Sequence, residues 1–266
     1  MAKNYAKKRL GQNFLQSQEV IKKIVSVISP KPNETIVEIG PGKGALTIPL
    51  AESGATILAV EFDVHLCRYL EKALTGKKNV SIIQKDFLQF IPAEYGLTSI
   101  KLCGNLPFNI TSPVVEWIVH HRSIIKKAVL MIQREVALRL SSEPGSKDWS
   151  PLAIFTQLHF EINYLFSVSP KEFSPSPKVT SAVVELVPKE SVEVEHYSQF
   201  EELVRASFKQ RRKQLINNLV PAIVPTTKAA EEIFNQLGFQ RNIRAEQIDT
   251  SQFLELTELL VQHNIL

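Results

Sequence analysis

The sequence lacks any long hydrophobic run. Its longest apolar stretches, such as residues 128–132, are far shorter than the roughly 20 residues that a membrane-spanning helix needs. The N-terminal segment MAKNYAKKRLGQNFL carries basic side chains but no apolar core after them, which excludes a secretory signal. We therefore expect a soluble, cytoplasmic protein.

Cysteine is scarce as well. The two cysteines, Cys67 and Cys103, lie in apolar contexts without CxxC spacing. This pattern favours reduced, packed thiols over a disulfide or a metal site. The six histidines are scattered and provide no pair of ligands at helical spacing. We expect no metal.

Charge is mildly basic, with a formal net charge of +4 and a pI of about 8.9. The basic residues gather in residues 3–9, in residues 209–213 and around Arg241 and Arg244. A solvated helix face is enough to explain any one cluster. Three clusters in one chain, two of them near aromatic residues, favour a polyanionic partner.

Strand and helix patterns alternate through the first part of the chain. Ser17 suits an N-cap, and apolar residues follow it at helical spacing until Pro30. The alternation is typical of an α/β fold with a mostly parallel sheet covered on both faces. Strands are predicted over residues 35–39, 56–60, 80–84, 99–103 and 128–133, and helices over residues 64–74, 112–121 and 135–140, with a further helix from the glycine-rich turn to about residue 53.

The pattern changes towards the C-terminus. Residues 162–168 and 180–187 predict a closing antiparallel pair around a proline-rich loop, and residues 188–196 form a polar linker. Every later pattern is helical. We expect an α/β domain over residues 1–190 and a small all-helical domain over residues 191–266. The later helices are predicted over residues 200–208, 212–220, 228–237 and 252–261.

A glycine-rich turn follows the first predicted strand. Gly40, Gly42 and Ala45 satisfy GxGxx(G/A), and Glu61 ends the next strand. The glycines let the backbone approach a ligand, and an acid about 20 residues further on accepts hydrogen bonds from ribose hydroxyls. The lysine of the turn is followed by glycine, which excludes a Walker phosphate loop. The pattern predicts a nucleoside cofactor, either a nicotinamide dinucleotide or S-adenosylmethionine.

A third acid, Asp86, ends the third predicted strand and is followed by Phe87. One interpretation is that the Asp86 carboxylate receives an adenine amino group while Phe87 packs on the ring. The alternative interpretation is that Asp86 caps a loop.

The fourth strand runs into Asn105-Leu106-Pro107-Phe108. Methylation of an exocyclic amine needs polar groups that orient the amine. The reason is that the N6 lone pair of adenine is delocalised into its ring, which makes N6 a poor nucleophile. Two acceptors, the Asn105 amide oxygen and the Leu106 carbonyl, would hold both N6 hydrogens and aim the nitrogen at the methyl donor. Pro107 makes the turn rigid, and Phe108 would stack on an extruded base. An ordinary strand-end turn with one core phenylalanine is the structural alternative.

Five motifs together carry a resemblance to a known family. They resemble the bacterial small-subunit (16S) ribosomal RNA adenine N6,N6-dimethyltransferases over nearly the whole chain. The resemblance implies a Rossmann-like class I methyltransferase fold with S-adenosylmethionine as the cofactor. The motifs are RLGQNFL at residues 9–15, EIGPGKGALT at residues 38–47, NLPFNI at residues 105–110, FSPSPKV at residues 173–179 and FKQRRK at residues 208–213.

The resemblance also implies roles for individual residues. Phe108 and Phe173 would sandwich the target adenine, beside Asn105, Leu106 and Pro107. Members of the family methylate two adjacent adenosines in a hairpin loop near the 3′ end of the small-subunit RNA during late assembly, and we expect a monomer that binds this RNA. The cofactor would be bound by Asn13, Leu15, Gly40, Glu61, Asp86 and Asn105, and the RNA by Lys7, Lys8, Arg9, Lys178, Arg211, Arg212 and Lys213.

One residue departs from the family pattern, which usually reads NLPY where this chain has Phe108. Stacking survives this change and only a phenolic hydroxyl is lost, so we expect activity to remain. Three other functions compete: methylation of a large-subunit adenine, a non-catalytic assembly factor, and a dehydrogenase. The intact glycine turn, acids and Asn105 argue against a pure binder, and a dehydrogenase leaves the NLPF turn and the basic clusters unexplained.

Overall fold

The computed structural model describes residues 13–190 and 194–266. The chain forms two compact units. The first comprises the chain up to Leu138 together with Phe160–Lys189, and the second comprises Arg139–His159 together with Glu190–Leu266. Lys7, Lys8 and Arg9 lie outside the described residues.

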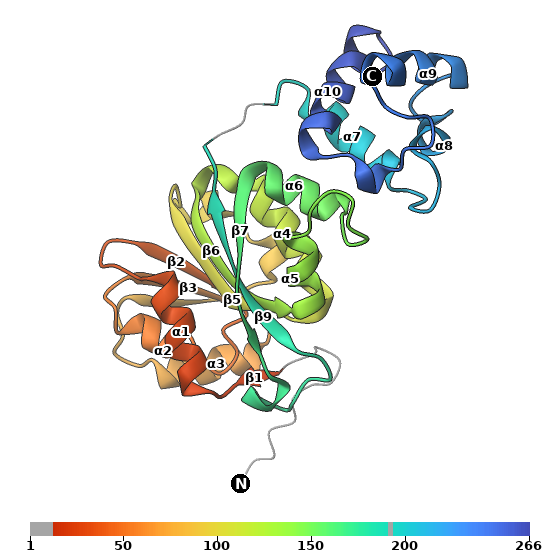
Figure 1. Cartoon of the computed structure of the whole chain (residues 1–266). Helices are drawn as coiled ribbons and strands as arrows, with labels where there is room; N and C mark the ends of the chain where they lie inside the picture. The colour runs from red at the N-terminus through yellow and green to blue at the C-terminus, as the bar shows by residue number, and fades with distance from the viewer. Residues whose placement is uncertain (1–12, 191–193) are drawn as a thin grey trace. The chain divides into compact units, whose positions relative to one another are not determined.

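The first unit is built on a seven-stranded sheet of order β4-β3-β2-β5-β6-β9-β7 (Figure 1). The five strands from β4 to β6 are parallel, while β9 is antiparallel to both β6 and β7. The predicted mostly parallel sheet and its closing antiparallel pair are therefore confirmed. The strands are β2 (Thr35–Ile39), β3 (Thr56–Glu61), β4 (Val80–Gln84), β5 (Ile100–Asn105), β6 (Ile125–Gln133), β7 (Phe160–Val168) and β9 (Ser181–Pro188).

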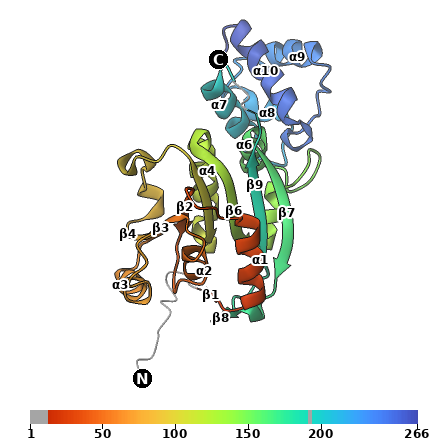
Figure 2. The ribbon, with the colours of Figure 1, turned by 90° about the vertical axis from the view of Figure 1, so that its left-hand side faces the viewer.

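Helices cover both faces of this sheet, which explains why its central strands are almost continuously apolar (Figures 1 and 2). On one face, α1 and α2 pack through Ile24 and Leu50 in a core that also holds Cys103 and Val129. The Ser17 hydroxyl accepts a hydrogen bond from the amide of Val20, which confirms the predicted cap. The helices of this unit are α1 (Gln18–Ile28), α2 (Thr47–Ala51), α3 (Val64–Ala73), α4 (Thr111–His120) and α5 (Arg134–Leu140), whose last two residues belong to the second unit.

A second, two-stranded sheet joins distant parts of the sequence. Strand β1 (Phe14–Leu15) pairs antiparallel with β8 (Phe173–Ser174), with Leu15 opposite Phe173. Two-residue strands are too short to show a periodic pattern. The sequence therefore contained no signal for this pairing, although both segments belong to motifs of the family.

The second unit is helical, and it contains a segment that we assigned to the first. Residues 139–159 belong to it because Trp149 and Phe155 lie in one core with Phe200 and Phe253. The division predicted at residues 190 and 191 is wrong for this segment, and helix α6 was not predicted. The helices of this unit are α6 (Pro151–His159), α7 (Tyr197–Ser207), α8 (Leu215–Leu219), α9 (Thr227–Gln236) and α10 (Thr250–Gln262). Within the described residues, no helix has the length and apolar character needed to cross a membrane.

Gly104 lets strands β5 and β2 approach each other closely beside the NLPF turn. A Cβ atom on Gly104 would lie 2.6 Å from the carbonyl oxygen of Ile39. We expect Gly104→Ala to lower the free energy of unfolding by about 1–3 kcal/mol, because backbone atoms cannot move aside as a side chain can. Urea unfolding measures the change. Gly104 does not have a positive φ angle, so the loss would come from packing and not from backbone strain. Wild-type stability of Gly104→Ala would contradict the packing argument.

Candidate functional site

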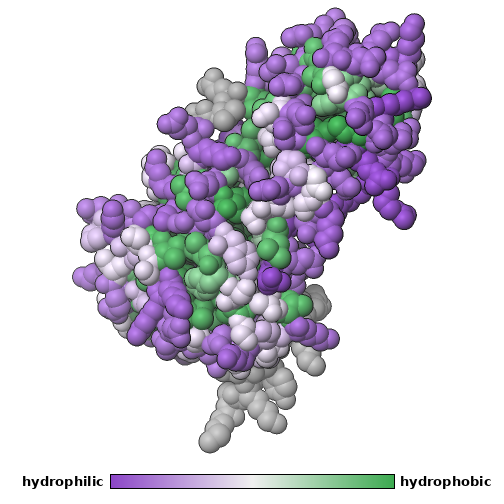
Figure 3. Space-filling model, viewed as in Figure 1, coloured by the Kyte–Doolittle hydropathy of each residue, from purple (hydrophilic) through white to green (hydrophobic). Residues whose placement is uncertain are grey.

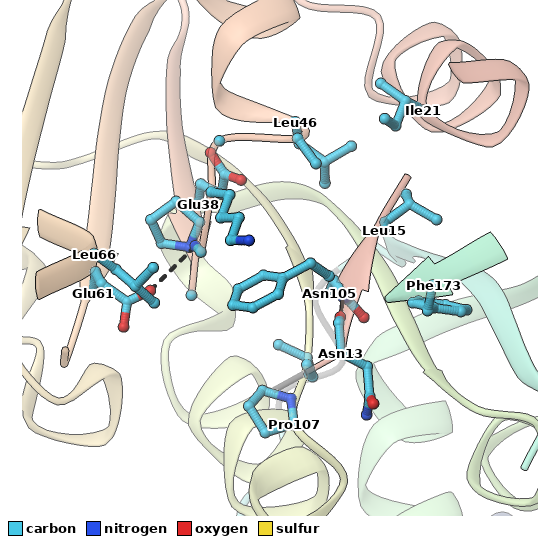
Figure 4. A pocket seen from close by; sticks show the side chains of 18 of the residues that line it. Asn13, Leu15, Ile21, Glu38, Leu46, Glu61, Leu66, Asn105, Pro107 and Phe173 are labelled. Atoms are coloured by element: carbon cyan, nitrogen blue, oxygen red, sulfur yellow. Dashed lines mark hydrogen bonds between the residues drawn. The ribbon is translucent and has the colours of Figure 1, made fainter. Parts of the chain in front are cut away.

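A cavity of about 600 Å³ opens at the carboxyl ends of the parallel strands in the first unit. Open α/β sheets bind their ligands at this edge. Figure 4 shows side chains from β1, β2, β3, β5 and β8 around this space. All ten residues that we assigned to the cofactor or the target base lie in its wall: Asn13, Leu15, Gly40, Glu61, Asp86, Asn105, Leu106, Pro107, Phe108 and Phe173.

The glycine turn connects β2 to α2 and lines the cavity. Gly40 and Gly42 have φ angles of 61° and 60°, a conformation that favours glycine. Gly42 has a second constraint, because a Cβ there would lie 3.2 Å from two ring carbons of Phe14. The turn therefore presents bare backbone to the cavity, as the GxGxx(G/A) pattern predicts.

Glu61 connects the end of β3 to the glycine turn. Its carboxylate accepts hydrogen bonds from the amides of Gly42 at 3.1 Å, the dashed line in Figure 4, and of Asp63 at 2.9 Å. Burial raises the pKa of Glu61, and these amide hydrogen bonds oppose the rise. Each carboxylate oxygen has a further lone pair, so Glu61 can also accept from two neighbouring hydroxyls.

The capping interpretation of Asp86 is confirmed, and its contact with an adenine stays a prediction. Its carboxylate caps the short 3₁₀ helix Phe87–Gln89 by accepting from the amide of Leu88 at 3.0 Å, and it also lines the cavity. Phe87 does not: it is 4% exposed and its ring lies 4.6 Å from that of Trp117. The expectation that Phe87 packs on a bound adenine is wrong, because this side chain points into an aromatic core. Phe62, which follows Glu61 in the chain, lines the cavity and is 65% exposed.

Asn105 is the last residue of β5, and a hydrogen bond holds one end of its carboxamide. Its Nδ2 donates to the main-chain carbonyl of Asn13 at 2.9 Å, so the Nδ2 atom is the end of the amide that faces β1. The amide of Leu106 donates to the carbonyl of Met131 at 3.0 Å and continues the pairing with β6. Pro107 then starts the 3₁₀ helix Phe108–Ile110, since its carbonyl accepts from the amide of Ile110 at 3.2 Å. Hydrogen bonds therefore anchor the NLPF turn on both sides.

Phe173 enters the cavity wall from β8 (Figure 4). Only 6% of its surface is exposed, because it packs in the same core as Leu15. Phe108, the last residue of the NLPF turn, is half-buried. The two aromatic residues that were predicted to hold a base therefore border the same cavity. That both of them stack on the base stays a prediction.

Glu38 is a site residue that our sequence interpretation missed. It lies on β2, lines the cavity and is 2% exposed. Among the described residues, neither its Oε2 nor the nearby Thr47 Oγ1 has a hydrogen-bond partner. Burial raises the pKa of Glu38 to about 7, the Glu61 carboxylate adds to the rise, and the nearby Thr47 opposes it. An acid inside the apolar strand TIVEI was the available signal.

The raised pKa of Glu38 predicts a pH dependence of stability. Below pH 4.5 Glu38 is protonated in both the folded and the unfolded state. Between pH 4.5 and about 7 only the unfolded state releases the proton, so stability falls as the pH rises, by on the order of 3 kcal/mol in total. We expect Glu38→Gln to flatten this part of the curve. Urea unfolding of both proteins from pH 4.5 to 8 measures it, and parallel curves would contradict the assignment.

The predicted RNA-binding residues have different surroundings. In the helical unit, whose visible face is mostly hydrophilic (Figure 3), Arg212 and Lys213 are exposed. The Arg211 guanidinium donates to the main-chain carbonyls of Lys147 and Trp149. It therefore holds its own unit together, in addition to any contact with RNA. Lys178 is exposed on the loop before β9.

The two cysteines are packed thiols, as the sequence predicted. Cys67 and Cys103 are buried free thiols, and burial raises the pKa of Cys67 to about 11. In the part of the chain that the structure describes, no three His, Cys, Asp or Glu side chains gather into a possible metal site.

Known proteins resemble nearly the whole chain. The model of a family described as ribosomal RNA adenine dimethylase matches residues 3–262. Ribosomal RNA small subunit methyltransferase A of Xylella fastidiosa (strain Temecula1) is 38% identical over 256 residues, which cover 94% of each chain. A dimethyladenosine transferase from Plasmodium falciparum has the same fold, with a TM-score of 0.82, 24% identity and coverage of 95% of this chain and 98% of that one. The 23S rRNA methyltransferase ErmE has a TM-score of 0.72, 26% identity and coverage of 94% and 100%. The match over nearly every residue, together with the cavity just described, means that this chain belongs to the ribosomal RNA adenine dimethylase family.

Proposed function

We propose that the protein uses S-adenosylmethionine to dimethylate N6 of two adjacent adenosines in a hairpin loop near the 3′ end of 16S ribosomal RNA. We further propose that it acts as a cytoplasmic monomer on the nearly assembled small subunit. The observation that carries the proposal is the single cavity that joins the glycine turn, Glu61 and the Asn105 turn. A relative named for the small-subunit RNA, 38% identical over 94% of each chain, supports this choice of substrate.

The acceptors and the bare backbone in the cavity wall fit the cofactor. Bare backbone at Gly40 and Gly42 allows close approach, and Glu61 can accept from the two ribose hydroxyls. The buried, unpartnered Oε2 of Glu38 suits a cationic group such as the ammonium of an amino acid. Asp86 lies in the wall where it can receive an adenine amino group. When bound, the cofactor supplies a methyl group on a sulfonium, which is an excellent leaving group.

Asn105 and Leu106 orient the target amine. Because the Asn105 Nδ2 donates to the Asn13 carbonyl, its Oδ1 is the end left to accept one N6 hydrogen. The Leu106 carbonyl accepts the other, since the Leu106 amide is already paired with β6. With both hydrogens held, N6 becomes partly pyramidal and its lone pair turns towards the methyl donor. Methylation makes N6 cationic and acidic, so its proton can pass to water without a strong base.

The target adenine must leave its RNA stack to reach this site. We propose that Phe108 stacks on one face of the base and Phe173 on the other. Phe173 is 6% exposed, so its face becomes available through a local shift of β8. The exposed Arg212, Lys213 and Lys178 contact RNA phosphates in this proposal, which makes binding weaken with added salt. Lys7, Lys8 and Arg9 have the same proposed role.

A methylation assay tests the function. Purified protein, S-adenosylmethionine and small subunits from a strain that lacks the modification are expected to give two adjacent dimethyladenosines, located by primer extension. Already modified subunits are the matched control and should accept no methyl groups. Transfer to large-subunit RNA instead would favour the competing methyltransferase function. Binding of cofactor and subunits without transfer to any ribosomal particle would favour the assembly factor.

A further inference from the structure

Phe14 lies at the junction of strand β1 and the glycine turn. Its ring faces Gly42, where a Cβ would come within 3.2 Å of two ring carbons. The Lys43 ammonium lies 4.7 Å from the centre of the same ring, within the range of a cation–π contact. Both residues belong to the cavity wall. The turn expected to bind the cofactor is therefore in contact with β1 through one aromatic side chain.

The other residues of this segment contact the base-binding side of the cavity. The carbonyl of Asn13 accepts from the Asn105 Nδ2 at 2.9 Å. Leu15 pairs with Phe173, and the amide of Gln16 donates to the carbonyl of Glu172 at 2.8 Å. Four consecutive residues thus connect three elements: the glycine turn, the amine-orienting turn and β8.

Strand β1 needs an anchor on each face. A two-stranded sheet of this length is not stable by itself in water. Side chains alternate along a strand, so Leu15 and Phe14 point to opposite faces. Leu15 is 6% exposed and packs in the apolar core, whereas Phe14 packs on the glycine turn. Phe14 therefore supplies the side-chain contact between β1 and the glycine turn.

We propose that Phe14 is a positioning residue that couples the cofactor site to the base site. It holds β1 against Gly42 and Lys43, so that cofactor binding at the glycine turn stabilises β1, and through β1 the Asn105 carboxamide and β8. The inference rests on the proposed function, because it assigns the cofactor to the glycine turn and the base to Phe173. It adds a physical link between the two sites and a second reason for glycine at residue 42.

Calorimetry with S-adenosylhomocysteine as the probe tests the first half of the link. We expect Phe14→Ala to raise the Kd about tenfold, because an unanchored β1 must be ordered when the ligand binds. Phe14→Tyr keeps the ring and is expected to stay within about threefold of the wild type. Lys43→Met removes only the cation, and we expect an intermediate increase of about twofold to fivefold.

Hydrogen exchange tests the second half, and a merely structural role would not produce its result. In the wild type, S-adenosylhomocysteine is expected to slow exchange of the amides of residues 173–174 as well as those of 15–16. In Phe14→Ala, a saturating amount of the probe should no longer protect residues 173–174. Steady-state kinetics should show a higher KM for S-adenosylmethionine together with a lower kcat.

Tyr69→Ala is the control, because Tyr69 is a 49% exposed aromatic residue on α3 that does not line the cavity. It should leave the Kd and the protection of residues 173–174 at wild-type values. The coupling role is overturned if Phe14→Ala binds the probe as the wild type does, or if Tyr69→Ala loses the same protection. If the wild-type protein fails to bind the probe, the assigned cofactor site is itself wrong and the coupling fails with it.

Discussion

Replacing Asn105 by alanine is expected to lower the rate constant for methyl transfer by about 100-fold to 1,000-fold, the loss typical when one oriented polar group is removed from an active site. The reason is geometric, because the Asn105 carboxamide is oriented by its hydrogen bond to the Asn13 carbonyl. RNA binding should remain, since the basic residues are unchanged. Single-turnover transfer to unmodified small subunits measures the rate, and filter binding measures the affinity.

Two further variants sharpen this test. Asn105→Asp keeps an acceptor but places a carboxylate oxygen against the Asn13 carbonyl, where the wild type has a 2.9 Å hydrogen bond. We therefore expect it to lose activity as well. Asn163→Ala is the control, because Asn163 lies on β7 in the same unit, outside the cavity, and makes a 3.5 Å hydrogen bond to Glu185. Wild-type transfer by Asn105→Ala would contradict the role of the carboxamide.

Replacing Glu61 by glutamine is expected to weaken S-adenosylhomocysteine binding by about 100-fold. The Glu61 carboxylate now accepts from both Gly42 and Asp63, and a glutamine NH₂ must face one of these amide donors. Hydrogen bonds to a charged group contribute about 1.5–3 kcal/mol each, and 100-fold corresponds to about 2.8 kcal/mol. A 100-fold loss of affinity therefore corresponds to about one or two such hydrogen bonds. These include the bonds that Glu61 would accept from the ribose hydroxyls.

Isothermal titration calorimetry measures this change. Glu52→Gln is the control, because Glu52 is an exposed acid that pairs with Lys77 outside the cavity. A Kd for Glu61→Gln within threefold of the wild type would mean that the glycine turn does not need its carboxylate partner. Unfolding midpoints of both variants separate a local effect from a loss of folding.

The parts of the site that the sequence predicted are those with a local cause. The strand ending at Ile39, its glycine turn and Glu61 each follow from a pattern of a few residues, and the structure has them at one edge of the sheet. Alternation of strands and helices then brings Asp86 and Asn105 to the same edge, because parallel strands end together. The Ser17 cap was also predicted correctly, because an N-cap depends on neighbouring residues only.

Predictions that depended on the direction of a side chain were less reliable. Phe87 follows Asp86 in the chain, yet it points into an aromatic core with Trp117. Arg211 is part of a basic cluster, yet its guanidinium binds the carbonyls of its own unit. Direction depends on which element packs nearby, and that information is not local. Trp149 joins the helical core rather than the sheet for the same reason.

By itself, the sequence determined the α/β fold, the family and ten of the residues that line the cavity, because each depends on short motifs whose conformation is set locally. Only the tertiary structure decided what lies between those motifs. It pairs Leu15 with Phe173, directs the Asn105 amide through Asn13, and buries Glu38 so that its pKa rises to about 7. These features arise from contacts between residues far apart in the chain, and burial and orientation exist only once those contacts have formed.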